Sequence, residues 1–159
     1  MLGSIKLPVV RFESVQKRAG LSFNHHEMDD EFYQRVLKFW FPPQVSLDTC
    51  HKTLWFVRSN TPQQFELDET IRYHFSDLLQ QALGEDASWR AHHCKTLDGH
   101  VALIILLDQF SRHIYRQNAE EDRSKKMAHV DRLAFQLACD LIDSNRHREL
   151  TYPLLCLLP

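Results

Sequence analysis

Three charged side chains follow one another at intervals of four residues near the middle of this 159-residue chain. Asp108, Arg112 and Arg116 come directly after an uninterrupted apolar run at residues 101–107, and Gln109 stands beside the aspartate. Residues four apart lie on one face of an α-helix. A carboxylate next to two guanidinium groups can bind an anion or a carboxylate, with Asp108 orienting the arginines or acting as a base. These residues are therefore the predicted ligand site.

Arg72 lies on a second predicted helix that could reach the same face, and it completes the candidate set. The same residues also fit a purely structural interpretation. Charges that are partly buried need partners, so the cluster would form a polar network that pins the two helices together. The sequence leaves both interpretations open.

Other reactive residue types lack the spacing that their chemistry needs. His92, His93, Cys94 and His100 can all ligate metals, but they match no closed zinc pattern. The chain has no Gly-x-Ser-x-Gly segment for nucleophilic catalysis, and its four glycines are too scattered to form a phosphate-binding loop. We therefore predict no metal ion and no cofactor, and the sequence leaves open whether the protein is an enzyme.

Two tryptophans, Trp40 and Trp55, are the candidates for lining a binding groove. The simpler interpretation places the aromatic cluster around Trp40 in the core. Residues 44–60 are predicted to be a loop or a short helical turn, in which Trp55 and Phe56 anchor the segment to the core.

Four stretches repeat apolar residues at helical spacing and are bounded by helix start and stop signals. They are predicted at residues 29–41, 62–83, 99–116 and 119–145. Residues 101–107 include β-branched side chains, but the polar continuation at helical spacing favours a helix over a strand. Residues 86–96 are predicted as a polar connection that Trp89 anchors. The predicted starts are Asp29 or Asp30, Thr61 with Pro62 and Gln64, and Asp98, and the predicted stops are Pro42-Pro43, Gly84 and Asn145.

Length and composition predict one soluble globular domain. The chain is 43% hydrophobic and 25% charged, which is ordinary for that class. Residues 1–27 show no sustained period and are predicted to be a loosely ordered tail, with residues 28–159 as a single helical domain. A net charge of −2 gives no attraction to nucleic acid. No apolar run approaches the roughly 20 residues that span a bilayer.

The four cysteines are scattered, which indicates free thiols in a reducing compartment and hence a cytoplasmic protein. The first 26 residues carry four basic residues against one acidic residue, so a mitochondrial location stays as the alternative. The chain ends on an apolar segment, TYPLLCLLP. Unless this segment docks on the core, we expect it to join copies of the chain into a homo-oligomer.

Three segments of the chain resemble one known family. Together they are similar to the domain of unknown function 924 family, over residues 36–146. The resemblance implies an all-α, tetratricopeptide-like array of antiparallel helices, and no activity is established for that family. The segments are VLKFWF at 36–41, the Asp68-x-x-Ile71-Arg72-x-x-Phe75 spacing, and the DQF-x-R text within 101–116.

The chain departs from the family pattern at positions that bear on a site. The pattern has proline and asparagine where this chain has Ser111 and His113, and arginine where it has His74. If these groups form a ligand site, this member has altered it. The family's further C-terminal helices are absent here, so the chain is expected to be truncated at that end relative to the family.

The function that the sequence favours is an interaction scaffold, a helical protein that binds a peptide or protein in a groove beside residues 99–116. The alternative is a small-molecule binding protein or enzyme that takes an anionic ligand through the Asp/Arg cluster. A pocket with these side chains pointing inward would favour the ligand. Side chains that saturate one another would favour the scaffold.

Overall fold

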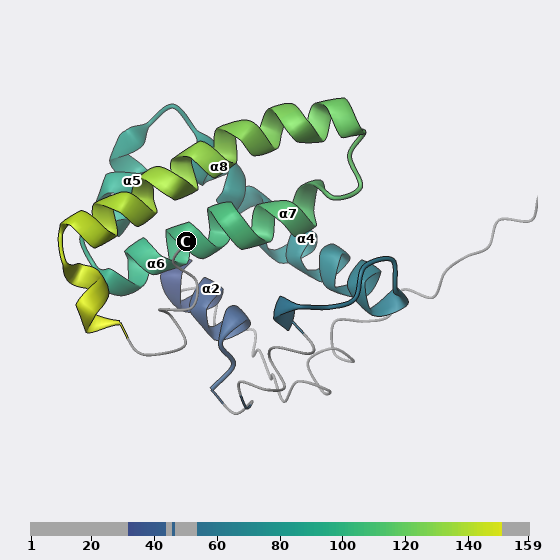
Figure 1. Ribbon diagram of the computed structural model, residues 1–159, viewed down its shortest axis with the longest axis horizontal. Coiled ribbons are helices and arrows are strands. Elements are labelled where there is room, and N and C mark those ends of the chain that lie inside the picture. The colour runs from purple at the N-terminus through teal and green to yellow at the C-terminus, as the bar shows by residue number, and fades with distance from the viewer. Residues whose placement is uncertain (1–31, 44–45, 47–53, 151–159) are drawn as a thin grey trace, which may run out of the picture.

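The structure is a computed structural model that describes residues 32–43, 46 and 54–150 (Figure 1). The helices in this part of the chain confirm the predicted all-α class, and no strand occurs among the described residues. They are α2 (Phe32–Trp40), α4 (Pro62–Leu83), α5 (Ala87–His93), α6 (Leu97–Ile105), α7 (Ser111–Tyr115) and α8 (Glu120–Asp143). A π-helical turn, η3 (Leu106–Phe110), joins α6 to α7, and a 3₁₀ turn, η4 (Arg146–Glu149), follows α8.

The apolar run at residues 101–107 lies inside one continuous helical rod, which we call the central rod and which consists of α6, η3 and α7. All seven side chains of the run are buried. The rod packs against α2, α4 and α8, and Figure 1 shows α8 lying along it. The prediction of a helix here is confirmed. A helix with no polar face needs neighbours on every side.

The central rod begins at Leu97, two residues earlier than predicted, and its cap is Thr96 and not Asp98. The Thr96 hydroxyl accepts a hydrogen bond from the Gly99 amide at 3.1 Å. Asp98 instead lies in the first helical turn, where the helix dipole favours a negative charge. Both residue types are common at the N-cap position. Thr96 is the N-cap because it has the extended backbone conformation that precedes the first helical turn.

Helix α4 has the predicted bounds, and its apolar face is buried. The Thr61 hydroxyl accepts a hydrogen bond from the Gln64 amide at 3.2 Å. The Gln64 side chain reaches back to accept one from the Asn60 amide at 2.7 Å, one residue before the cap. Gly84 ends the helix with a negative φ of −56°, so the left-handed conformation that often ends helices is not used.

The connection predicted at residues 86–96 is wrong, because α5 occupies most of it. Asp86 starts this helix, and its carboxylate accepts a hydrogen bond from the Ser88 amide at 2.8 Å. Trp89 is the predicted anchor, and its ring lies 5.1 Å from that of Phe32 on α2. A helix of seven residues is too short for its periodicity to stand out in a polar sequence.

The prediction that both Trp55 and Phe56 are anchored in the core holds for only one of them. Trp55 is partly buried and donates its indole N–H to the Trp40 carbonyl at 3.1 Å. Phe56 is largely exposed, and Leu54 is the buried residue of this segment. Successive side chains of an irregular segment point in different directions, so two neighbouring aromatic residues rarely share one pocket.

The remaining helix ends agree with the stop signals. Helix α2 ends at Trp40, before Pro42-Pro43. Helix α8 ends at Asp143, and Asn145 then adopts a left-handed conformation with φ of 58°. Ile142, in the last turn of α8, is exposed.

Several predictions fall on residues outside the described part of the chain. They concern the caps Asp29 and Asp30, the tail at 1–27 and the apolar segment at 151–159. The tetratricopeptide-like stacking also stays a prediction. Across the described residues, no helix is both long enough and apolar enough to cross a bilayer.

Candidate functional site

The predicted Asp/Arg cluster divides into two separate groups. In the first group, Arg112 lies 3.0 Å from an Asp108 oxygen and 3.1 Å from an oxygen of Asp131 on α8. Arg112 is half exposed, with 50% of its side-chain surface open to solvent. Gln109 donates a hydrogen bond to the second Asp108 oxygen. The members of this group pair with one another, and the Arg112–Asp131 pair links the central rod to α8.

Arg72 does not join either carboxylate of the first group. It pairs with Glu69 one helical turn earlier on α4. Its Nε and Nη2 atoms both lie 3.4 Å from the Ile114 carbonyl oxygen, to which they donate. Arg72 therefore ties α4 to the main chain of α7, and its charge is already neutralised.

Arg116 belongs to a second group, which sequence reasoning missed. Its Nε atom lies 3.0 Å from Oδ2 of Asp68, and the Asp68 side chain is completely buried at 0% exposure. The two atoms attract each other as an ion pair, although the Nε–H is not aligned for a hydrogen bond. About a third of the Arg116 side chain, 34%, stays exposed. The guanidinium group therefore reaches from a buried carboxylate to the surface.

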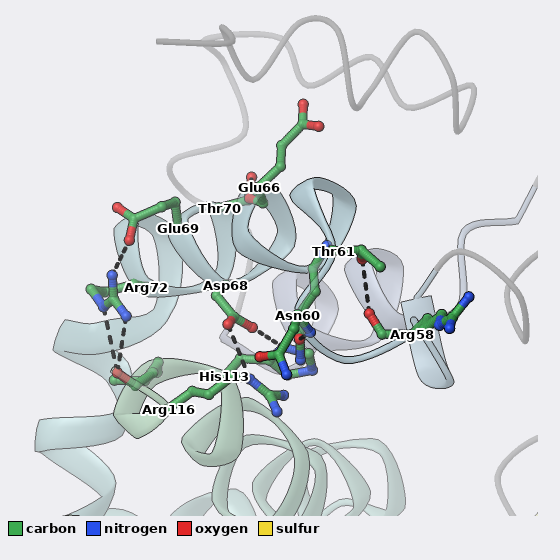
Figure 2. Close-up of polar contacts among 12 residues, drawn as sticks. Arg58, Asn60, Thr61, Glu66, Asp68, Glu69, Thr70, Arg72, His113 and Arg116 are labelled. Atoms are coloured by element: carbon green, nitrogen blue, oxygen red, sulfur yellow. Dashed lines mark hydrogen bonds and ion pairs between the residues drawn. The ribbon is translucent and has the colours of Figure 1, made fainter. Parts of the chain in front are cut away.

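His113 holds the other oxygen of the same carboxylate. Its Nδ1 atom lies 2.7 Å from Oδ1 of Asp68, and the His113 side chain is nearly buried. An ionised carboxylate can only accept hydrogen bonds, so Nδ1 donates. We call Asp68, His113 and Arg116 the Asp68 site. Figure 2 shows Asp68 pointing from α4 toward the two side chains that face it.

Local structure explains how these three residues meet. Asp68 lies on the buried face of α4, one helical turn after Gln64. His113 and Arg116 are three residues apart at the end of α7, so they share a face of the central rod. The π-turn η3 precedes them, and in it the Ser111 amide donates to the Leu106 carbonyl, five residues back. Such turns inside helices are frequent at functional sites.

A signal for Asp68 was present in the sequence. The residue stands within the apolar stripe of α4, between Leu67 and Ile71, where a carboxylate must be buried with a partner. His113 was noted only as a departure from a family pattern. The partner could not be assigned because the two residues are 45 positions apart.

The two candidate groove tryptophans lie close to this site. Trp40 is buried, and its ring centroid lies 6.3 Å from that of His113. Its indole N–H is buried and has no hydrogen-bond partner among the described residues. Trp55 also lies beside Trp40, with ring centroids 6.5 Å apart. Trp40 therefore forms an apolar wall beside His113, and Trp55 covers that wall.

Metal binding finds no support in the part of the chain that the structure describes. Within it, no group of three or more histidine, cysteine, aspartate or glutamate side chains could hold a metal ion. The Asp68 site supplies one carboxylate and one imidazole, and its third member is a cation.

Comparison with known proteins gives one match. The family model described as "Bacterial protein of unknown function (DUF924)" matches residues 36–157, a range that includes the whole Asp68 site. No curated protein and no solved structure matches the chain.

Proposed function

The chain belongs to the DUF924 family of bacterial proteins of unknown function, as its sequence predicts, and from that premise we propose that it binds a small anionic ligand at the Asp68 site. The ligand contacts Arg116 and His113 at the end of the central rod. This is the alternative function of the sequence analysis, moved from Asp108 to a different carboxylate. One observation carries the proposal. The buried Asp68 carboxylate contacts an arginine and a histidine, and each of the two contacts it through a single nitrogen.

The contrast between two arginines supports the proposal. Arg112 meets two carboxylates, both through Nη2, so its positive charge is offset twice and attracts an anionic ligand less. Arg116 meets Asp68 through Nε alone, and its recorded partners among the described residues include none for the two Nη atoms. A guanidinium fork that is held at its base and exposed at its tip suits a carboxylate or phosphate.

A carboxylate as deeply buried as that of Asp68 is costly to maintain. Apolar side chains could hold the two helices together at least as well, since buried ion pairs often stabilise a protein less than apolar packing does. The Asp68 charge instead fixes the position of the arginine and the tautomer of the imidazole. An aspartate that orients a histidine is also the arrangement found in general bases.

The test is a thermal-unfolding and titration experiment with small carboxylates such as propionate and lactate. Ligand at a hundred times its Kd stabilises a protein by about 2.7 kcal/mol, so the wild-type midpoint should rise with concentration. Arg116→Lys keeps a positive charge beside Asp68 but removes the planar fork, and we expect affinity to fall about tenfold. Arg112→Lys is the matched control and should bind like the wild type. No binding by the wild type, or equal losses in both variants, would contradict the proposal.

A second candidate function, the interaction scaffold, is favoured by a different observation. The apolar run of the central rod, residues 101–107, is buried against the neighbouring helices. Helix α8, however, exposes Phe135 at 63% together with Ile142, and residues seven apart share one helix face. A peptide selected against the protein from a display library should bind this face. Phe135→Ser should then abolish binding, and Tyr73→Ser, at another exposed aromatic residue on α4, should not.

A further inference from the structure

We infer that the ligand of the Asp68 site is a small hydroxy acid, a molecule with one carboxylate and a hydroxyl group close to it. This inference rests on the proposed function and names its ligand class. It follows from the hydrogen-bonding polarity of the two groups that the Asp68 carboxylate holds.

His113 presents an acceptor. Its Nδ1–H is committed to Oδ1 of Asp68 at 2.7 Å. A neutral imidazole with its proton on Nδ1 carries a lone pair on Nε2. The structure records no partner for Nε2 among the described residues, and the side chain keeps 10% of its surface exposed. The group that meets Nε2 must therefore be a donor, such as a hydroxyl.

Arg116 presents only donors. A guanidinium group has five N–H bonds and no acceptor, and one of them is directed at the Asp68 side. The N–H groups at the exposed tip need an acceptor that can take two parallel hydrogen bonds. A carboxylate has that geometry.

The charge balance favours one negative charge on the ligand over two. Asp68 already offsets the charge of Arg116 at 3.0 Å. The nearby cations are also committed, since Arg72 pairs with Glu69 and Arg112 pairs with Asp108 and Asp131. A dianionic phosphate would face the Asp68 charge without a second free cation. A monoanionic carboxylate meets less repulsion.

The two groups lie within the span of one small molecule. His113 and Arg116 are three residues apart on a helical backbone, which places their Cβ atoms about 5–6 Å apart. Both side chains are also drawn to the same carboxylate. A hydroxyl on the carbon next to a carboxylate can therefore meet Nε2 while the carboxylate meets the arginine.

The experiment compares lactate with propionate, which differ by one hydroxyl group, in NMR titrations of the full chain. We expect the wild type to bind lactate at least about tenfold more tightly than propionate, because a site built to hydrogen-bond a hydroxyl rejects an analogue that lacks it. Inorganic phosphate is the third probe and should bind more weakly than lactate.

The key variant is His113→Asn. The asparagine amide can still donate to Asp68 from the position of Nδ1, so the fold and propionate binding should persist. The Nε2 acceptor is removed, so the ratio of the affinity for lactate to the affinity for propionate should fall to about one. A preference that survives in this variant would overturn the inference, as would tighter binding of phosphate than of lactate.

The outcomes separate this inference from the proposed function. If no anion binds, the proposed function fails and the inference fails with it. If lactate and propionate bind equally, and Arg116→Lys weakens both, then the site binds carboxylates and only the hydroxy-acid inference is wrong. If lactate is preferred and His113→Asn removes the preference, both stand.

Discussion

At the scale of single residues, the candidate site is built around a carboxylate that has no exposed surface, that of Asp68. Asp68 is compensated on one oxygen by Arg116 and on the other by His113. The two members of the ion pair differ in their access to water, because Arg116 is partly exposed and Asp68 is not. Removing the arginine and removing the aspartate should therefore lower the free energy of unfolding by different amounts.

The first prediction uses that inequality. Arg116→Gln leaves a buried charge on Asp68 without its cation, and we expect a loss of about 3 kcal/mol in the free energy of unfolding. Asp68→Asn leaves Arg116 free to turn to solvent, and the amide oxygen can still accept from His113, so its loss should be about 1 kcal/mol. Urea unfolding of both variants measures the difference. The interpretation is wrong if Asp68→Asn proves as costly as Arg116→Gln.

The second prediction concerns Asp108, the carboxylate that the sequence singled out. Its pair with Arg112 is substantially exposed on both sides, and exposed pairs contribute about 0–1 kcal/mol. Arg112 also keeps Asp131 as a partner. Asp108→Asn should therefore change the unfolding free energy by less than about 1 kcal/mol and leave carboxylate binding intact. A loss of ligand binding would return Asp108 to the site.

Residue spacing predicted one contact on the charged face of the central rod but not the others. Asp108 and Arg112 do pair, as their four-residue spacing indicates. Arg116, at the next step of the same series, turns instead to a carboxylate on α4. Local spacing determines which side chains can meet within one helix. It carries no information about which helix packs beside it.

At the scale of elements, the central rod is held by its apolar run, whose side chains at residues 101–107 are all buried. Leu106 has no exposed surface and stands at the start of the π-turn η3. Leu106→Ala should destabilise the protein by about 2–5 kcal/mol, because it removes buried methyl groups and leaves a cavity. Leu133→Ala, at a partly buried residue of α8, is the comparison and should cost less. A thermal melt in which the two variants behave alike would argue against this packing.

The sequence was most informative where a helix carries both a cap and a stop. Helix α4 has Thr61, Pro62 and Gln64 at one end and Gly84 at the other, and its bounds were predicted to the residue. Helix α5 was missed because seven residues with a single large apolar side chain, Trp89, show no clear period. The π-turn was also not predicted. One extra residue in a helical turn is a response to packing around it, and no residue type is specific to it.

At the scale of the whole molecule, stability should depend on pH through two histidines, one buried and one partly buried, whose pKa values are lowered in the folded protein. His100 joins α6 to α8, with its Nε2–H donating to the Leu137 carbonyl at 2.8 Å. Burial, more than any other cause, lowers the pKa of His100, and the nearby Arg146 lowers it further. Burial also lowers the pKa of His74, with a contribution from Arg35.

The direction of the effect follows from these lowered pKa values. Below the pKa of an unfolded histidine, about 6.5, the unfolded chain binds protons that the folded protein does not. The histidines therefore contribute their full share to the free energy of unfolding above that pH. This contribution is lost as the pH drops toward the lowered pKa values of the folded state. Urea unfolding at pH 7.5 and 5.5 should show the loss. His100→Gln keeps a donor for Leu137, and it should reduce the loss while His74 maintains the rest. A pH dependence that His100→Gln leaves unchanged would assign the effect to other groups.

The central claim is that Arg116 and His113 together bind a small carboxylate ligand. The most direct measurement is side-chain ¹⁵N NMR of the histidines and arginines during a titration with lactate. We predict that the free protein carries the His113 proton on Nδ1, and that the signals of His113 Nε2 and the Arg116 guanidinium shift together and saturate, while those of Arg112 stay in place. Signals of His113 and Arg116 that remain unchanged at saturating lactate, or a shift at Arg112 alone, would contradict the claim.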